Sequence, residues 1–147
     1  MKFYDYLEVI EKKAKEEKEV LDFLSKKNTL DNIEIRACKN SFQVLIEALI
    51  GKSKKILKHY NCPIIPQRSK DAIYILSEVG VLSEEEYKEF SSAVGFRNVM
   101  IYDYLEFDEN ILYDMLKAKK YENIYNFLVS EVKLSDTIIS RIEKFTF

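Results

Sequence analysis

The 147-residue sequence contains only three glycines, two prolines, two cysteines, one histidine and no tryptophan. So few glycines and prolines leave little room for the many turns that a protein built from short strands needs. Apolar residues make up 47% of the chain and charged residues 33%, a balance that is typical of long amphipathic helices with short connections. We therefore predict an all-α fold, an up-and-down helical bundle in a single domain spanning residues 1–147.

The scarcity of cysteine and histidine argues against a metal site. Cys38, Cys62 and His59 cannot complete a four-ligand zinc site without carboxylates, and the two cysteines are not spaced as CxxC. We expect no metal and no cofactor. Long apolar runs are also missing, and the segment after Met1 lacks the apolar core of a signal peptide, so we expect a cytoplasmic protein with reduced thiols and no membrane contact.

Excess charge of one sign is absent as well. The formal net charge is -2, so the chain has no overall positive field that would attract a phosphate backbone. Binding of nucleic acid would have to depend on a local group of cations.

Apolar residues at helical spacing predict two long helices. Steps of three and four from Phe3 to Leu24 indicate a helix over about 3–27. Several side chains between 28 and 32 can cap a second helix, whose broad apolar face reaches near Tyr60 and suggests burial on two sides. Ala48 and Gly51 place small residues on one side of this helix, which more often means close helix packing than approach of a ligand.

Shorter helices follow a connection that contains Pro63 and Pro66, neither of which can continue a helix. Gly80 is well placed as a left-handed helix terminator, and Ser83 with Glu86 has the form of a capping box. The predicted limits are about 68–80, from 83 into the segment 95–108, from Asp108 to about 129, and from Ser135 or Asp136 onward. The bundle should therefore hold about four to six helices.

The segment 95–108 gathers the side chains best suited to chemistry. Arg97 offers a planar fork of donors that fits a phosphate, and Asn98 could orient either that phosphate or Arg97 itself. A purely structural alternative pairs Arg97 with Asp103, Glu106 or Asp108. In an unbroken helix Tyr104, at i+7, would share the face of Arg97, whereas Tyr102, at i+5, would lie about 140° away.

In its residue types and their spacing, this segment resembles the motif of HEPN-domain ribonuclease toxins of the HepT type. That motif consists of an arginine, four to six intervening residues, a histidine, one intervening residue and a tyrosine. Arg97 and Tyr104 fit the motif, and Tyr102 stands where the family has its histidine. The segments 93–98 and 103–104 together carry the resemblance. The order of the neighbouring helices extends it to roughly residues 33–130.

The resemblance implies a helical homodimer whose motif residues face a cleft between protomers, and a metal-independent ribonuclease activity on RNA. It assigns catalytic roles to Arg97, Asn98 and Tyr102. It also implies that the protein is the toxin of a type VII toxin–antitoxin pair, whose partner is a minimal nucleotidyltransferase antitoxin of the MntA type. In such pairs the antitoxin silences the toxin by adding AMP to the motif tyrosine, which here is Tyr104.

Tyr102 lowers the expected activity. Histidine titrates near neutral pH and can take a proton from a ribose 2′-hydroxyl, whereas a phenol has a pKa near 10. Loss of general acid–base catalysis typically costs about 10² to 10⁴ in rate. His59, in the long second helix, is expected to be a surface or packing residue and not a substitute base. The alternative function is a non-catalytic helical dimer that binds RNA or the nucleotidyltransferase.

Overall fold

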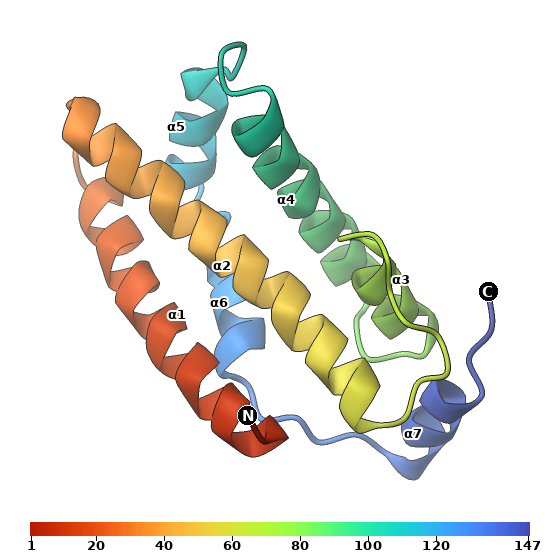
Figure 1. Ribbon diagram of the computed structural model, residues 1–147. Coiled ribbons are helices and arrows are strands. Elements are labelled where there is room, and N and C mark those ends of the chain that lie inside the picture. The colour runs from red at the N-terminus through yellow and green to blue at the C-terminus, as the bar shows by residue number, and fades with distance from the viewer.

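The computed structural model describes residues 1–147 and contains seven α-helices and no strands (Figure 1). The helices are α1 (Phe3–Ser25), α2 (Asn32–His59), α3 (Asp71–Glu78), α4 (Glu84–Tyr102), α5 (Glu109–Lys117), α6 (Glu122–Val129) and α7 (Asp136–Glu143). The predicted all-α fold is confirmed, whereas the predicted number of four to six helices is too low.

The extra helix arises from a break in the segment that was predicted as one helix from 108 to about 129. Lys119 adopts a left-handed backbone with φ 51°. The N–H of Lys119 donates to the carbonyl of Leu116 (3.1 Å), and the N–H of Lys120 donates to the carbonyl of Met115 (2.9 Å). These bonds end α5 in the way that a left-handed glycine usually does. The chain uses lysine there, so the sequence offers no glycine signal for the break.

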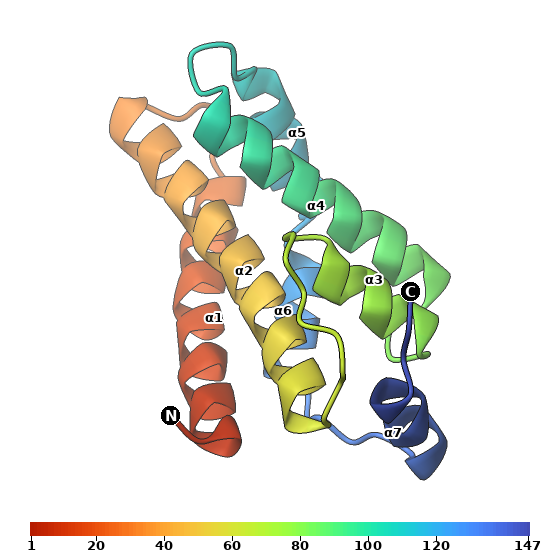
Figure 2. The same cartoon turned by 45° about the vertical axis from the view of Figure 1, so that its right-hand side comes forward.

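The two long helices α1 and α2 run antiparallel and side by side, with α4 on the other side of α2 (Figures 1 and 2). Gly51 permits the close approach of α1, because a Cβ atom at this position would lie 2.5 Å from the hydroxyl oxygen of Tyr6. The predicted close packing at Gly51 is therefore confirmed. No helix of the structure is both long enough and apolar enough to span a membrane.

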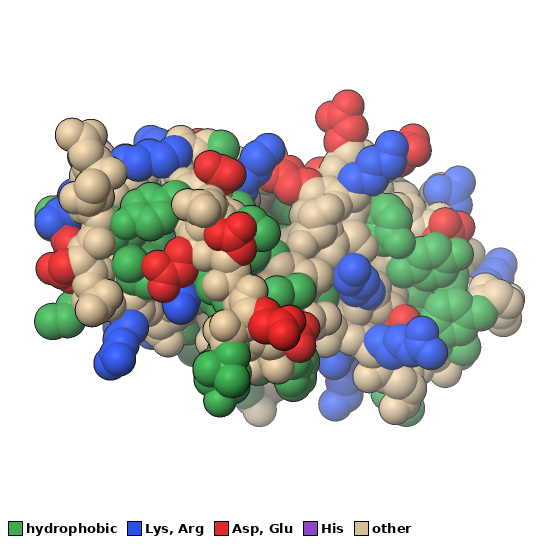
Figure 3. Space-filling model, turned by 90° about the horizontal axis from the view of Figure 1, so that it is seen from above, with side chains coloured by type: hydrophobic (Ala, Val, Ile, Leu, Met, Phe, Trp, Pro, Cys, Tyr) green, Lys and Arg blue, Asp and Glu red, His purple; other side chains and the backbone are tan.

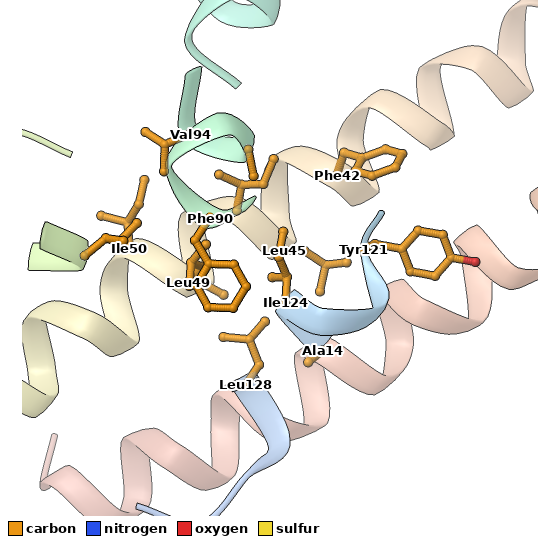
Figure 4. Close-up of a cluster of buried hydrophobic side chains, with 14 of the residues drawn as sticks. Ala14, Phe42, Leu45, Leu49, Ile50, Phe90, Val94, Tyr121, Ile124 and Leu128 are labelled. Atoms are coloured by element: carbon orange, nitrogen blue, oxygen red, sulfur yellow. The ribbon is translucent and has the colours of Figure 1, made fainter. Parts of the chain in front are cut away.

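The core lies between α2 and the helices packed around it, α1, α3, α4 and α6, and Figure 4 shows a part of it. Leu45 and Leu49 of α2 are fully buried near Phe90 of α4 and Ile124 of α6, while the buried ring of Phe42 makes an edge contact with Tyr121. Since α2 also packs along α1, its broad apolar face is covered from two sides, as predicted. This packing fixes the position of α4 relative to α2, and the candidate site lies on these two helices.

Local hydrogen bonds define where the helices begin and end. Capping boxes start α2, through Asp31 and Glu34, and α4, through the predicted pair Ser83 and Glu86. Gly80 has a φ of 95°, which confirms its predicted left-handed conformation after α3. Two further predicted caps are confirmed, those of Asp108 on α5 and of Ser135 on α7.

Candidate functional site

The motif residues lie at the carboxyl end of α4 and in the connection that follows. Arg97, Asn98 and Tyr102 belong to α4, which ends at Tyr102, while Tyr104 lies in the 103–108 connection. This connection forms the loop between α4 and α5 at the top of Figures 1 and 2. Tyr102 and Tyr104 are 71% and 67% exposed, and neither hydroxyl has a hydrogen-bond partner within the chain. Both phenols are therefore accessible from solvent.

Arg97 is held by two neighbours. Its Nη1 donates to Oδ1 of Asn98 at 2.9 Å, and its Nη2 donates to Oε1 of Glu47 on α2 at 3.2 Å. The Arg97 side chain is only 17% exposed, and its Nε is buried without a hydrogen-bond partner. Asn98 thus orients Arg97, one of its two predicted uses. Arg97 does form an ion pair, but its partner is Glu47. The predicted partners Asp103, Glu106 and Asp108 were wrong.

Glu47 was missed from the sequence because it lies 50 residues before Arg97 and on a different helix. Its position on α2 gives no local sign of this contact. Only the packing of α2 against α4 brings the two side chains together.

The end of α4 at Tyr102 changes the geometry that was expected for the tyrosines. Because Tyr104 lies outside the helix, the i+7 relation does not place it on the face of Arg97. Tyr102 is within α4, about 140° around the axis from Arg97 and on the side of Asn98. Within one chain, Tyr102 and Arg97 therefore project in different directions from α4.

Aromatic packing holds the Phe107 end of the exposed loop. The ring of Phe96 makes edge contacts with Phe42 in the core (5.8 Å between centroids) and with Phe107 (5.6 Å). The ammonium of Lys39 lies 5.1 Å from the centre of the Phe107 ring. Phe96 and Phe107 thus fix the end of the loop and leave its middle, with Tyr104, in solvent. The Phe-Asp pair at 107–108 is the sequence signal for this anchor.

The surface near the loop is not strongly basic. Every charged residue from 103 to 109 is acidic, namely Asp103, Glu106, Asp108 and Glu109. Seen from above, the molecule shows acidic, basic and hydrophobic side chains interspersed, without a continuous basic patch (Figure 3). RNA bound at this face would therefore depend on a few individual cations.

The structure also shows the surroundings of His59 and of the two cysteines. His59 stacks on Phe3, with 4.0 Å between ring centroids and 9° between planes, so it is a packing residue near the chain's first helix turn. Cys38 is fully buried, and burial raises the pKa of its thiol to about 12, while Cys62 is half-buried. No group of three or more His, Cys, Asp or Glu side chains is arranged to hold a metal ion.

The motif is not enclosed by this chain alone. Five cavities of the structure are lined by other residues, and none of them includes Arg97, Asn98, Tyr102 or Tyr104. The arrangement can offer an oriented guanidinium and two free phenols on an open surface. It does not by itself form a closed substrate pocket.

A family model described as Ribonuclease HepT-like matches residues 5–130. This range includes nearly all of α1, the whole of α2 to α6 and all four motif residues. A search of curated proteins found no significant match.

Three solved structures share the fold. One, a toxin–antitoxin with AMP-PNP, has a TM-score of 0.68 at 18% identity, covering 94% of this chain and 99% of that chain. A tri-AMPylated HEPN toxin from Shewanella oneidensis, in complex with MNT antitoxin, has a TM-score of 0.68 at 19% identity, covering 89% and 100%. The cytosolic protein YutE from Bacillus subtilis, of unknown function, has a TM-score of 0.66 at 20% identity, covering 92% and 90%.

Proposed function

Because this chain belongs to the HepT-like ribonuclease family, whose model matches residues 5–130, we propose that it is the toxin of a toxin–antitoxin pair and that RNA is its substrate. The observation that carries the proposal is the arginine at the end of α4, oriented by Asn98 and followed by two exposed tyrosines. Two of the solved structures that share this fold contain a toxin with its antitoxin, and in one of them the antitoxin is of the MNT type. A nucleotidyltransferase antitoxin is therefore the partner that we propose.

Arg97 is the phosphate-binding residue in this proposal. A guanidinium can donate two parallel hydrogen bonds to a phosphate, and it stays charged when buried. Two donors of Arg97 would bind the phosphate. Nε has no hydrogen-bond partner in the chain, and Nη2 donates to Glu47, which the phosphate would replace. Asn98 keeps the guanidinium in place while the phosphate replaces Glu47.

Tyr102 occupies the position of the proton carrier. Cleavage through the 2′-hydroxyl needs a group that removes a proton from this hydroxyl and a group that returns one to the leaving oxygen. A phenol does this poorly at neutral pH compared with an imidazole. The chain as it stands should therefore bind RNA and cleave it slowly or not at all.

A second copy of the chain would complete the site in this proposal. Tyr102 and Arg97 project in different directions from one α4, and neither lines any of the five cavities described above, so two facing protomers can bring the arginine of one toward the tyrosine of the other. The homodimer places the motif in a shared cleft, and we propose that it acts in the cytoplasm.

The experiment that tests the proposal is the change Tyr102→His. In the presence of a metal chelator, the variant should cleave single-stranded RNA faster than the unchanged protein by about two or more orders of magnitude. A further Arg97→Ala change in that variant should abolish cleavage again, since the phosphate would lose its charged fork. Equal cleavage rates before and after Tyr102→His would overturn the assignment of Tyr102 to the proton-carrier position.

The second candidate function is a non-catalytic module that binds RNA or the nucleotidyltransferase. The tyrosine at position 102 is the observation that favours it. If Tyr102→His binds RNA with the affinity of the unchanged protein and neither protein cleaves it, this function replaces the catalytic one.

A further inference from the structure

Glu47 of α2 lies in a row of hydrogen bonds that includes the motif arginine. Its Oε1 accepts from Nη2 of Arg97 (3.2 Å) and from Nε2 of Gln43 (3.2 Å), which lies one turn earlier on α2. Arg97 in turn donates from Nη1 to Asn98 (2.9 Å). Oε2 of Glu47 has no hydrogen-bond partner in the chain, and the side chain is 44% exposed. Glu47 therefore offers an accessible carboxylate oxygen beside the guanidinium.

Cleavage through the 2′-hydroxyl restricts where a proton acceptor can lie. This hydroxyl attacks the phosphorus atom next to it, so the group that removes its proton must lie beside the bound phosphate. The attacking and leaving oxygens lie roughly in line, on opposite sides of the phosphorus. One side chain at position 102 therefore cannot remove the first proton and deliver a proton to the leaving oxygen in the same step. A second group is needed for one of the two transfers.

Glu47 is the proton acceptor that the structure places against Arg97. It is the only carboxylate within ion-pair distance of that guanidinium. Tyr102 projects from α4 about 140° away from Arg97. His59 lies about 18 Å farther along the axis of α2 at 1.5 Å per residue, and its ring is stacked on Phe3. Within one chain, neither of these side chains reaches the phosphate that Arg97 would bind.

Gln43 keeps the carboxylate of Glu47 at the site after a phosphate has taken Nη2 of Arg97. The bond between Gln43 and Glu47 joins positions i and i+4 of one helix, so it does not depend on the arginine. Once displaced from Nη2, the carboxylate has lost its cationic partner and lies beside a phosphate anion. Both changes favour uptake of a proton. RNA that binds to Arg97 thus makes Glu47 a better base.

We propose that Glu47, positioned by Gln43, removes the proton of the 2′-hydroxyl, which makes it a catalytic residue of the proposed ribonuclease site. As the carboxylate takes this proton, the 2′-oxygen forms a bond to phosphorus and the bond between phosphorus and the 5′-oxygen breaks. The 5′-oxygen receives a proton from the side chain at position 102. The products are a 2′,3′-cyclic phosphate and a 5′-hydroxyl, and proton exchange with water restores both side chains. The inference rests on the proposed function and deepens it.

The test compares variants made in the Tyr102→His protein. Cleavage of a fluorescein-labelled single-stranded oligoribonucleotide is followed at saturating protein with a metal chelator present, so that the rate reports the chemical step and not the affinity. Adding Glu47→Gln should lower this rate by about 10² to 10⁴. Anisotropy with the 2′-O-methyl form of the same oligonucleotide, which cannot be cleaved, should show equal or tighter binding. A carboxylate that only competes with the phosphate would give tighter binding at an unchanged rate, and this result would overturn the proposal.

Two further variants complete the comparison. Gln43→Ala should lower the cleavage rate by a smaller factor than Glu47→Gln and leave the affinity unchanged, because Gln43 acts through Glu47. The matched control is Glu16→Gln, which removes an exposed, ion-paired carboxylate from α1 and should change neither the rate nor the affinity. Equal Tm values for all variants show that the fold is kept, as expected for a partly exposed side chain such as Glu47.

The pH dependence of the rate gives a readout that a structural role would not change. In the Tyr102→His protein the rate should fall at low pH, where Glu47 takes up a proton, and at high pH, where the imidazole has lost the proton that it must donate. Glu47→Gln should lose the fall at low pH, whereas Glu47→Asp, which still carries a carboxylate, should keep it.

The outcomes separate this inference from the proposed function. If Tyr102→His cleaves RNA and adding Glu47→Gln changes neither the rate nor its fall at low pH, Glu47 is not the base while the proposed function stands. If Tyr102→His binds RNA without cleaving it, the assignment of Glu47 is wrong and the non-catalytic function replaces the catalytic one. If neither the unchanged protein nor Tyr102→His binds RNA, both fail together.

Discussion

Nη2 of Arg97 lies 3.2 Å from Oε1 of Glu47, so the cation of the motif is already paired with an anion from α2. The two side chains differ in freedom, because Arg97 is 17% exposed and Glu47 is 44% exposed. A phosphate can therefore displace the more exposed carboxylate while the guanidinium stays in place against Asn98. In the proposed function, Glu47 is paired with Arg97 while RNA is absent and competes with the RNA phosphate when RNA binds.

The first prediction concerns this competition. Glu47→Gln removes the negative charge but keeps a side-chain oxygen that can accept from Nη2 of Arg97. The variant should bind the labelled oligoribonucleotide about two- to fivefold more tightly, because a partly exposed ion pair contributes up to about 1 kcal/mol. Glu16→Gln on α1 removes a similarly exposed, ion-paired carboxylate and is the matched control. Equal affinities for the two variants would contradict the competition between Glu47 and the phosphate.

Lys52 supports the other end of the bundle. Its side chain is 1% exposed, and its Nζ donates to the backbone carbonyls of Phe127 (2.6 Å), Leu128 (3.3 Å) and Ser130 (2.9 Å). These carbonyls lie at the carboxyl end of α6, where a helix leaves acceptors without intrahelical partners. Lys52 therefore joins α2 to the end of α6 and satisfies buried acceptors.

The second prediction is that Lys52→Met lowers the free energy of unfolding by about 1 to 3 kcal/mol or more, because methionine fills the space but leaves buried carbonyls without a donor. Urea unfolding followed by circular dichroism measures the change. Lys54→Met, an exposed neighbour on α2, should change the stability little. If the two variants are equally stable, the contacts of Lys52 with α6 contribute nothing to folding.

Burial also gives Lys52 a pH dependence. It lowers the pKa of Lys52 from 10.5 to about 8, so between these values the unfolded chain holds a proton that the folded chain has lost. The contribution of Lys52 to stability therefore rises with pH above about 8. The advantage of the unchanged protein over Lys52→Met should grow by about 1 to 2 kcal/mol between about pH 8 and pH 9.5. Since Cys38 is present in both proteins, its titration cancels in this difference.

Local signals explain what the sequence could predict. The capping box of Ser83 and Glu86, the cap of Asp108 and the left-handed Gly80 each depend on residues within three positions of one another. Hydrophobic spacing likewise gives α1 and α2 nearly to their ends, because a helix face repeats along the sequence. The candidate segment was found for the same reason, as its residues are close in sequence.

Contacts between distant elements explain what was missed. Glu47 meets Arg97 only because the helices pack as they do. Lys119 breaks the predicted fifth helix with a backbone conformation that lysine rarely adopts, so composition gave no warning. Lysine is rarely buried in proteins, and the burial of Lys52 depends on carbonyls that α6 brings from 75 residues away.

The last prediction concerns modification of the loop tyrosine by the proposed antitoxin. Tyr104 is 67% exposed and lies outside any helix, so its hydroxyl can enter the active site of another protein. Tyr113 is a poor acceptor of AMP, since its hydroxyl accepts from the N–H of Leu30 at 3.0 Å and is half-buried. Incubation with the cognate nucleotidyltransferase and ATP should transfer AMP to Tyr104 and release pyrophosphate.

Mass spectrometry of peptides locates the adduct, and two single changes separate the neighbouring phenols. Tyr104→Phe should lose the modification, whereas Tyr102→Phe should keep it, although Tyr102 is exposed to a similar extent. The reason is position: Tyr102 belongs to the last turn of α4, and Tyr104 stands free in the loop whose ends are fixed by Phe107 and α4. An adduct that persists in Tyr104→Phe and disappears in Tyr102→Phe would show that the acceptor is Tyr102, and that the role given to Tyr104 by its place in the motif is wrong.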